Sequence, residues 1–348
     1  MSAADQYDYD LPSDLISQEP LPDRSAARLL HVRRAAGSLA HHHVRDLADL
    51  LRPGDLLVVN DTRVVPARLI GRRVATGGRW EGLYLRTTPE GPWQILAHTR
   101  GRPVIGESIA LVDGDNQEAL RLQLVGRGAG GTWLAQPDRA GSAEDLLATV
   151  GRVPLPGYIR GGEARADDTA DYQTVFARLA GSAAAPTAGL HFTSALLESL
   201  AARGVERAGV TLHVGIDTFR PITVERLDDH PMHTEWCHCP EETVAAVLAT
   251  QQRGGRVVAV GTTAARTLET AAAGGAIQPW CGPTSLFIRP GHRFGAVDCL
   301  LTNFHMPRTT LLVLVSTFAG RELVARAYSE AIRQRYRLLS YGDCMLLE

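Results

Sequence analysis

The sequence predicts an α/β layered main domain, discontinuous along the chain, with an inserted all-β, barrel-like domain. Three observations lead to this expectation. The chain has 348 residues, which is long enough for two domains. Strand-like runs alternate with helical periodicity in residues 1–68 and 151–348, which is typical of α/β layers. Residues 69–150 instead hold short β-type runs between Gly-, Pro- and Asp-bearing turns, which indicates a small barrel.

In the first part of the main domain, the sequence predicts an extended stretch followed by three regular elements. Residues 7–22 are punctuated by prolines. A short β run follows at 29–32, and helical spacing at 44–51 ends before the breaker pair Pro53–Gly54. A compact β run then occupies 56–59.

For the inserted domain, the sequence predicts a series of short strands and then one helix, at 143–149. The strand-like runs lie at 82–86, 93–98, 108–112, 120–125 and 132–135.

After residue 158 the alternation of helices and strands returns. The helices are expected at 172–179, 193–203, 241–253, 263–273 and 321–335, and another begins at Thr309 or Thr310. The strands are expected at 205–214, 256–260, 285–288 and 298–302.

Composition excludes several classes of protein. The formal net charge is −2, and all 36 basic residues are arginine because the chain contains no lysine. Enzymes that form a lysine Schiff base and phosphate loops that need a lysine are therefore excluded. Five cysteines are too sparse for a disulfide framework and indicate a reducing compartment. The acidic start lacks signal-peptide features and no apolar run is long enough for a bilayer, so we expect a cytoplasmic protein without a membrane partner.

Polar residues gather directly after predicted strands, where sites usually lie. Asn60, Asp61 and Arg63 follow one β run and can orient a ribose or a carboxylate, although an Asx turn between two strands has the same composition. Asn303 and His305 follow another β run in the same way. We expect all five residues to bind substrate.

Two loops of small residues lead into helices. Residues 181–193 place alanines and a proline before His191, which fits either a ligand loop or a buried turn with a core histidine. Residues 257–269 form a β run, a Gly-Thr-Thr turn and a helix whose free amides suit an anion. The residues of these loops that we expect to bind substrate are Thr187, Thr262, Thr263 and Arg266.

Two further loops pair a histidine with a carboxylate. His213 closes a β run shortly before Asp217, and such a pair can exchange protons; Thr218 beside it is expected to bind substrate. His233 and Glu235 lie in a segment rich in histidine and cysteine. Its spacing fits no standard tetrahedral zinc pattern, so we expect no metal site.

A basic stretch opens the inserted domain. Residues 68–102 hold seven arginines and two glutamates, with Trp80, Tyr84 and Trp93 interleaved. This combination suits contact with an RNA backbone and stacked bases. A solvated arginine face on an ordinary barrel would have the same composition. The residues expected to contact RNA are Arg72, Arg73 and Arg79.

Long collinear segments over nearly the whole chain carry a family resemblance. They include PGDLLVVNDTRVVPARLIG at 53–71, AAPTAGLHFT at 184–193, TLHVGIDTFRPI at 211–222, VAVGTTAARTLE at 258–269 and VDCLLTNFHMPRTTLLVLVSTFAG at 297–320. In these segments the chain resembles the S-adenosylmethionine:tRNA ribosyltransferase-isomerase family of queuosine biosynthesis.

The resemblance implies an α/β domain with an inserted β-barrel, and an unusual reaction. The ribosyl group of S-adenosylmethionine is isomerised to an epoxycyclopentane and transferred to 7-aminomethyl-7-deazaguanine at the tRNA wobble position. Adenine and methionine leave, and the product is epoxyqueuosine. The resemblance thus implies S-adenosylmethionine as co-substrate, no further cofactor, and tRNA as the partner.

Such a reaction makes definite demands on side chains. The sulfonium acidifies the 5′ C–H bonds, so that a positioned base can remove a proton. Adenine needs a proton as it leaves, and the oxyanion formed from the ribose needs hydrogen-bond donors. From residue chemistry we expect His213 with Asp217 as proton carriers, His191 on the adenine side, and His233 and Glu235 as further catalytic residues.

The chain departs from the usual family pattern at three places. Asp217 replaces a glycine, residues 101–106 form a shorter segment without lysine, and Trp80 and Gly82 stand where aliphatic residues are expected. These positions are expected to face the acceptor. Two other functions therefore stay open: the same chemistry on a different, small acceptor, and a non-catalytic RNA- or nucleoside-binding protein.

Overall fold

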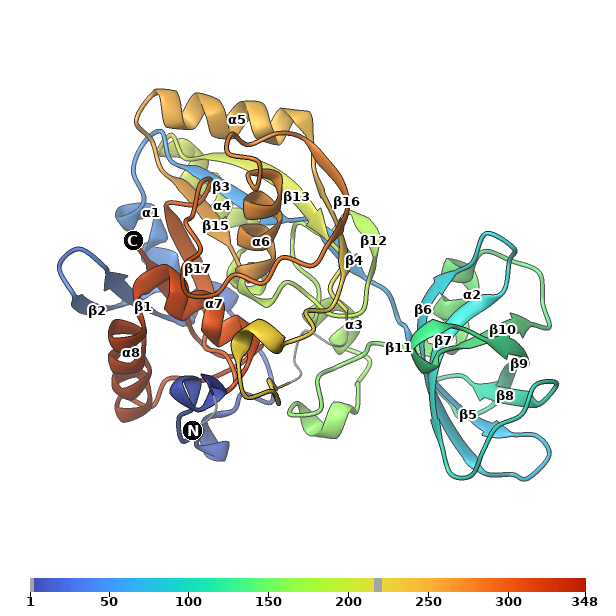
Figure 1. Cartoon of the computed structure of the whole chain (residues 1–348). Coiled ribbons are helices and arrows are strands. Elements are labelled where there is room, and N and C mark those ends of the chain that lie inside the picture. Colours follow the sequence, from blue (N-terminus) through green and yellow to red (C-terminus); the bar gives the residue numbers. More distant parts are fainter. Residues whose placement is uncertain (1–2, 216–220) are drawn as a thin grey trace. The chain divides into compact units, whose positions relative to one another are not determined.

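The computed structural model describes residues 3–215 and 221–348, and its contacts divide the chain into two units (Figure 1). Unit 2 comprises Val64–Leu155 and Gly162–Ala170, and unit 1 comprises the rest of the described chain. Nothing in the sequence indicated that Gly162–Ala170 belongs to unit 2. One contact that joins this segment to the barrel is the hydrogen bond from the Arg68 side chain to the carbonyl of Gly162.

Unit 1 is built on a nine-stranded mixed sheet with a parallel centre. The four adjacent strands β13, β3, β15 and β17 run parallel to one another. The sequences of β3, β15 and β17 are near-continuous apolar runs, because strands covered on both faces need no polar alternation. In spatial order the strands are β16 (Trp280–Thr284), β14 (Glu235–Cys239), β13 (Glu206–Leu212), β3 (Leu56–Asn60), β15 (Val257–Val260), β17 (Cys299–Asn303), β18 (Cys344–Leu347), β1 (Arg28–Arg33) and β2 (Ser38–His43).

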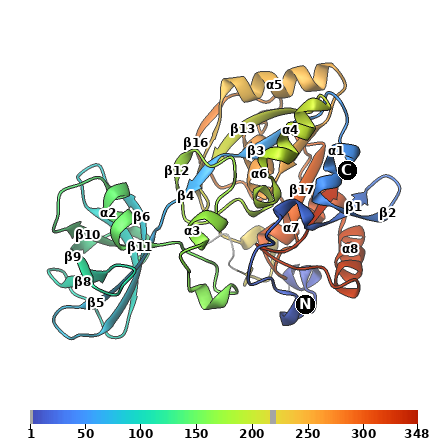
Figure 2. The ribbon, with the colours of Figure 1, turned by 180° about the vertical axis from the view of Figure 1, so that it is seen from behind.

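Both faces of this sheet carry a packed core. Leu56 and Val58 of β3 belong to one buried cluster, and Leu57 and Val59 belong to the other. The first cluster includes side chains of α5, α6, α7 and α8, and the second includes side chains of α1 and α4; Figures 1 and 2 view these helices from opposite sides. The bounds of these helices are α1 (Leu47–Leu50), α4 (Ser194–Ala202), α5 (Glu241–Gln252), α6 (Thr262–Ala271), α7 (Thr310–Ala319) and α8 (Arg321–Arg333).

Short elements complete the description. A two-stranded pair joins β4 (Thr62–Val64) to β12 (Leu179–Ser182), and α3 (Asp168–Asp171) spans the last boundary between the units. Within the described residues, no helix has the length and apolar character needed to cross a membrane. The 3-10 helices are Ala3–Tyr7, Ser13–Leu15, Arg24–Ala26, Val44–Asp46, Ala129–Gly131, Arg160–Gly162, Thr187–His191 and Leu227–Asp229.

Unit 2 is an antiparallel barrel of six strands, closed by pairing between β5 and β8. A short strand, β11 (Gly151–Arg152), pairs with β5, and the helix α2 (Ala143–Val150) precedes it. The barrel strands are β5 (Arg68–Arg73), β6 (Arg79–Thr87), β7 (Trp93–Thr99), β10 (Trp133–Pro137), β9 (Glu118–Arg127) and β8 (Ser108–Val112).

The departures from the family pattern at Trp80 and Gly82 are a matched pair inside this barrel. The Trp80 side chain is fully buried, and a Cβ on Gly82 would lie 2.2 Å from its Cη2 atom. The tryptophan therefore requires the glycine. Because the indole lies in the core, the expectation that these two residues face the acceptor is wrong.

Two predicted elements are also wrong. Residues 172–179 form turns and the start of β12 rather than a helix, because the amides of Arg178 and Leu179 donate to the carbonyl of Asp61. Residues 285–288 are not a strand; β16 ends just before them, and the carbonyl of Leu286 accepts a hydrogen bond from the Arg266 side chain instead.

Candidate functional site

The carboxyl ends of the four parallel strands meet at one edge of the unit 1 sheet. Asn60 and Asn303 are the last residues of β3 and β17, and Gly261 and His213 directly follow β15 and β13. In open α/β sheets, ligands bind beyond this edge. The polar residues singled out in the sequence therefore gather where the fold favours a site.

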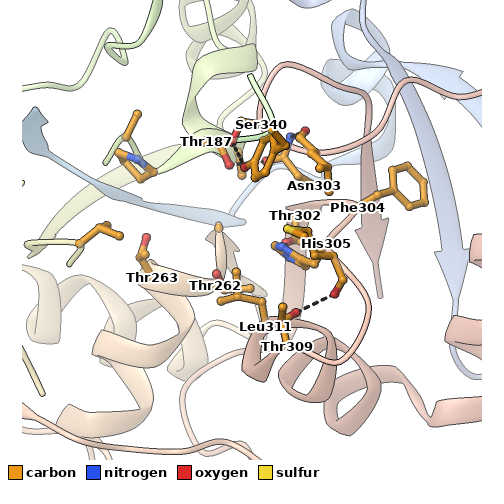
Figure 3. Close-up of a pocket in the computed structure, with 18 residues that line it drawn as sticks. Thr187, Thr262, Thr263, Thr302, Asn303, Phe304, His305, Thr309, Leu311 and Ser340 are labelled. Carbon is orange, nitrogen blue, oxygen red and sulfur yellow. Dashed lines mark hydrogen bonds between the residues drawn. The ribbon is translucent and has the colours of Figure 1, made fainter. Parts of the chain in front are cut away.

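A pocket of about 600 Å³, open to solvent, lies at this edge (Figure 3). Figure 3 shows Thr187 and Ser340 on one side of it and Thr262 and Thr263 on another. Among the described residues that line it, none is an arginine, an aspartate or a glutamate. Its polar lining residues are Tyr158, Thr187, Thr262, Thr263, Thr302, Asn303, His305, Thr309 and Ser340.

The first turn of α6 forms part of the pocket wall. Gly261 precedes the helix with φ 89° and ψ 156°, a conformation that favours glycine. No side chain caps the helix, so its first N–H groups lack a partner within it. Thr262 is 8% exposed, and no residue of the chain, as far as the structure describes it, bonds to its hydroxyl.

Asn60 lies behind the pocket and holds two strands and Thr263 in place. Its amide nitrogen donates to the Leu212 carbonyl at 3.0 Å and to the Thr263 hydroxyl at 3.1 Å. Its amide oxygen accepts from the N–H groups of Thr62 and Leu212. Asn60 is 2% exposed and uses all of its hydrogen-bonding groups within the protein, so it positions Thr263 and does not line the pocket.

Asn303 connects the pocket to His191. The Thr187 hydroxyl donates to its amide oxygen at 2.9 Å, and its amide nitrogen lies 3.3 Å from His191 Nε2. Burial, with the charges of Arg24 and Arg337, lowers the pKa of His191 to about 4. A neutral imidazole whose Nε2 already accepts from Asn303 is a poor proton donor, and His191 lines a smaller adjacent cavity rather than the pocket.

His305 is the imidazole that lines the pocket. Its Nε2 lies 2.7 Å from the Thr302 hydroxyl, and Figure 3 shows the two side chains together in the wall. The Tyr328 hydroxyl accepts from its backbone N–H, which fixes the loop. Burial lowers the pKa of His305 to about 3, so the ring is neutral at neutral pH.

Tyr158 is the second titratable side chain in the lining, and sequence reasoning missed it. Its hydroxyl lies 2.7 Å from the hydroxyl of Ser340. Burial raises the pKa of Tyr158 to about 12, although the hydrogen bond with Ser340 opposes the rise. Tyr158 therefore keeps its proton. Its place in a loop with no neighbouring motif left no signal in the sequence.

His213 lies at the strand edge without lining the pocket, whereas Val214 next to it does. Its Nδ1 is 2.8 Å from the Thr62 hydroxyl, and its ring stacks on Trp236 at 5.2 Å between centroids. Burial lowers the pKa of His213, and the charge of Asp61 partly opposes this. Its expected partner Asp217, with Thr218, lies outside the described residues.

His233 and Glu235 form a buried network with Arg266. Glu235 accepts from Arg266 and from the backbone N–H of Gly215, and His233 Nε2 lies 3.3 Å away from its carboxylate. Burial alone would raise the pKa of Glu235, but the His233 hydrogen bond and the Arg266 charge leave it below its usual value. Arg266 also donates to the carbonyls of Leu286 and Thr284. These groups line a small cavity that shares Thr262 and Thr263 with the pocket, but they do not line the pocket itself.

Asp61 and Arg63 also lie outside the pocket lining. Asp61 accepts from Arg178 at 2.7 Å and from the Thr211 hydroxyl at 2.6 Å, so its carboxylate stabilises the sheet edge. Arg63 is half-buried in β4.

The arginine-rich stretch of unit 2 is partly neutralised. Arg73 forms a bidentate pair with the buried Glu107, while Arg79 is 71% exposed and pairs with Glu81. Arg72 is exposed. Trp80 and Trp93 are buried in the barrel core, so the expectation that they stack on RNA bases is wrong.

Within the described residues, no group of three or more histidine, cysteine, aspartate or glutamate side chains could hold an ion. The histidines and cysteines near Glu235 are divided between β14, its cross-strand neighbours and the network with Arg266.

Comparison with known proteins gives consistent matches. The sequence pattern of the family described as Queuosine biosynthesis protein matches residues 4–347. Two proteins named S-adenosylmethionine:tRNA ribosyltransferase-isomerase are each 49% identical to this chain. The one from Symbiobacterium thermophilum aligns over 342 residues and the one from Geobacter sulfurreducens over 345, in both cases 98% of either chain.

A solved structure is similar as well. It is the S-adenosylmethionine tRNA ribosyltransferase of Thermotoga maritima, 36% identical, with a TM-score of 0.57. The match covers 99% of this chain and 100% of that one.

Proposed function

Because this chain belongs to the queuosine biosynthesis protein family, we propose that it catalyses the reaction for which its relatives are named. It transfers and isomerises the ribosyl group of S-adenosylmethionine to 7-aminomethyl-7-deazaguanine at the tRNA wobble position, and adenine and methionine leave. The product is epoxyqueuosine. The single observation that carries this function is 49% identity over 98% of both chains to enzymes of that name. S-adenosylmethionine is the co-substrate and tRNA the acceptor.

The pocket of unit 1 is the place we assign to S-adenosylmethionine. The pocket sits beyond the carboxyl ends of parallel strands, where ligands of open α/β sheets bind. Hydroxyls from Thr187, Thr262 and Ser340 line it beside apolar groups such as Val214 and Leu311. This combination suits a nucleoside, which offers an apolar base together with many hydrogen-bonding groups.

His305 and Tyr158 are the acid–base pair that the lining offers. At neutral pH the His305 ring is neutral and can accept a proton, and the Tyr158 phenol is protonated and can donate one, although burial weakens both as base and acid. We assign proton removal from the ribose C5′ to His305, with its Nε2–H donating to Thr302 so that Nδ1 carries the lone pair. We assign protonation of the leaving adenine to the Tyr158 and Ser340 hydroxyl pair.

The other residues expected in the site receive supporting roles. Asn60 positions Thr263, and Asn303 positions Thr187. His213, His191 and the network of His233 and Glu235 lie behind the pocket and stabilise the segments that line it. The roles of Asp217 and Thr218 remain predictions from the sequence.

We assign catalysis and tRNA binding to different units. The layered sheet and helices of unit 1 form the catalytic domain, and exposed arginines of the barrel, Arg72 and Arg79, contact the tRNA backbone. Arg73 is bound to Glu107 and acts within the barrel.

Adenine release from S-adenosylmethionine tests the proposal. The protein is incubated with S-adenosylmethionine and tRNA that carries the aminomethyl-deazaguanine base, with unmodified tRNA and with the free base as controls. The expected result is adenine release only with the modified tRNA and epoxyqueuosine in the digested product. Release with the free base alone would point to a small acceptor, and release with none of them would refute the enzyme assignment.

A further inference from the structure

We infer that the N-terminus of α6 binds the carboxylate of the methionine part of S-adenosylmethionine, with the Thr262 hydroxyl as a direct ligand. The inference rests on the proposed function, since it takes S-adenosylmethionine as the occupant of the pocket. It adds a binding group for one end of that substrate.

The lining of the pocket poses a problem for this substrate. S-adenosylmethionine carries a carboxylate, and a carboxylate taken out of water needs charge or several hydrogen bonds. The described lining has no arginine, and its one histidine, His305, is neutral. An anion in this pocket therefore depends on backbone N–H groups and hydroxyls.

The first turn of α6 supplies such groups. The helix has 10 residues and begins at Thr262, directly after the parallel strand β15. Free N–H groups and the positive end of the helix dipole favour an anion at this point. The positive φ of Gly261 turns the chain so that Thr262 and Thr263 become part of the pocket wall.

A second helix provides a contrast. α7 also begins at the pocket, but the Thr309 hydroxyl accepts from the N–H of Leu312 and donates to the Met306 carbonyl. Its N-terminus is therefore capped by its own side chain. Of these two helix ends at the pocket, only that of α6 keeps its amides for a ligand.

The Thr262 side chain is the second, independent observation. The residue is 8% exposed and lines the pocket, and over the described chain nothing bonds to its hydroxyl. A hydroxyl in the pocket wall that no protein group occupies is available to donate to a ligand. The neighbouring Thr263 differs, because Asn60 holds its hydroxyl.

Two sources could supply an anion here: the carboxylate of S-adenosylmethionine and a phosphate of the tRNA. We favour the carboxylate because the amides and the hydroxyl lie in the wall of the pocket that takes the nucleoside. Titration without RNA, and then with it, separates the two sources.

The test compares S-adenosylmethionine with decarboxylated S-adenosylmethionine by calorimetric titration of the full-length protein without RNA. The wild type is expected to bind the decarboxylated ligand at least about 10-fold more weakly, because hydrogen bonds to a charged group are lost. Thr262→Val should weaken binding of S-adenosylmethionine about 10-fold and leave binding of the decarboxylated ligand unchanged. Thr262→Ser should restore the preference.

Thr317→Val serves as the matched control, since the Thr317 hydroxyl bonds within α7 to the Val313 carbonyl. It should bind both ligands like the wild type. Equal affinity of the wild type for the two ligands would overturn the inference and leave the proposed function intact, as would a Thr262→Val variant that loses affinity only for tRNA. A wild type that binds neither ligand would overturn both, and this comparison does not depend on any variant folding.

Discussion

Replacing Asn60 by alanine should destabilise unit 1 strongly, although the sequence marks this residue as a substrate ligand. The side chain is 2% exposed and makes four hydrogen bonds. Alanine removes all four. The hydroxyl of Thr263 can turn to another partner, but the N–H and carbonyl of Leu212 and the N–H of Thr62 are fixed by the strands.

The magnitude follows from these three backbone groups. Each buried group left without a partner costs about 1 kcal/mol at the lower end of the usual range, so the loss is about 3 kcal/mol. For a folding unit of this size, about 1 kcal/mol corresponds to about 2–4 °C, which gives a fall in melting temperature of about 6–12 °C.

Scanning calorimetry of the wild type and the Asn60→Ala variant measures the effect. Gln251→Ala is the control, because it deletes a side-chain amide from an exposed position of α5 and should change the melting temperature little. An Asn60→Ala variant that melts like the control but binds S-adenosylmethionine much more weakly would refute the reasoning. Asn60 would then be a ligand and not a positioning residue.

Three other changes test separate parts of the account. Gly82→Ala should destabilise the barrel by about 1–3 kcal/mol because the new Cβ meets the indole of Trp80. Adding Trp80→Leu should relieve this loss in the double variant. Denaturant unfolding measures both effects, and additive losses of stability would contradict the clash. Glu235→Gln should cost about 3 kcal/mol at pH 7 because the buried charge of Arg266 loses its carboxylate partner. Since the folded pKa of Glu235 lies below its usual 4.5, this difference should shrink as the pH falls below about 4.5; a constant difference down to pH 3 would count against the ion pair. His305→Gln should slow adenine release at least about 100-fold, and an unchanged rate in this variant would remove His305 as the base. The wild-type rate should have no inflection near pH 6.5, because the pKa of His305 is about 3.

The sequence predicted the position of the site better than the direction of its side chains. The apolar runs of β3 and β15 and the turn at Thr262 marked the strand ends where the pocket lies, and Thr262 does line it. His213 was expected to act there because it ends a strand. Successive residues of an extended chain point to opposite sides, so Val214 lines the pocket and His213 does not.

Contacts between distant segments explain what sequence reasoning missed. Tyr158 meets Ser340, which is 182 residues further along the chain, and no local pattern can indicate such a pair. The helix expected at 172–179 fails for a related reason, because the carbonyl of Asp61 takes the amides that the helix would have used. Local propensity yields to such partners.

The central claim is that S-adenosylmethionine reacts in the pocket at the carboxyl ends of β3, β15 and β17. A crystal structure of the protein with S-adenosylmethionine tests it most directly. The account predicts the ligand in this pocket, with its carboxylate at Thr262 and its ribose C5′ beside His305. A ligand bound at another place in unit 1, or in this pocket with its C5′ far from His305, would contradict it.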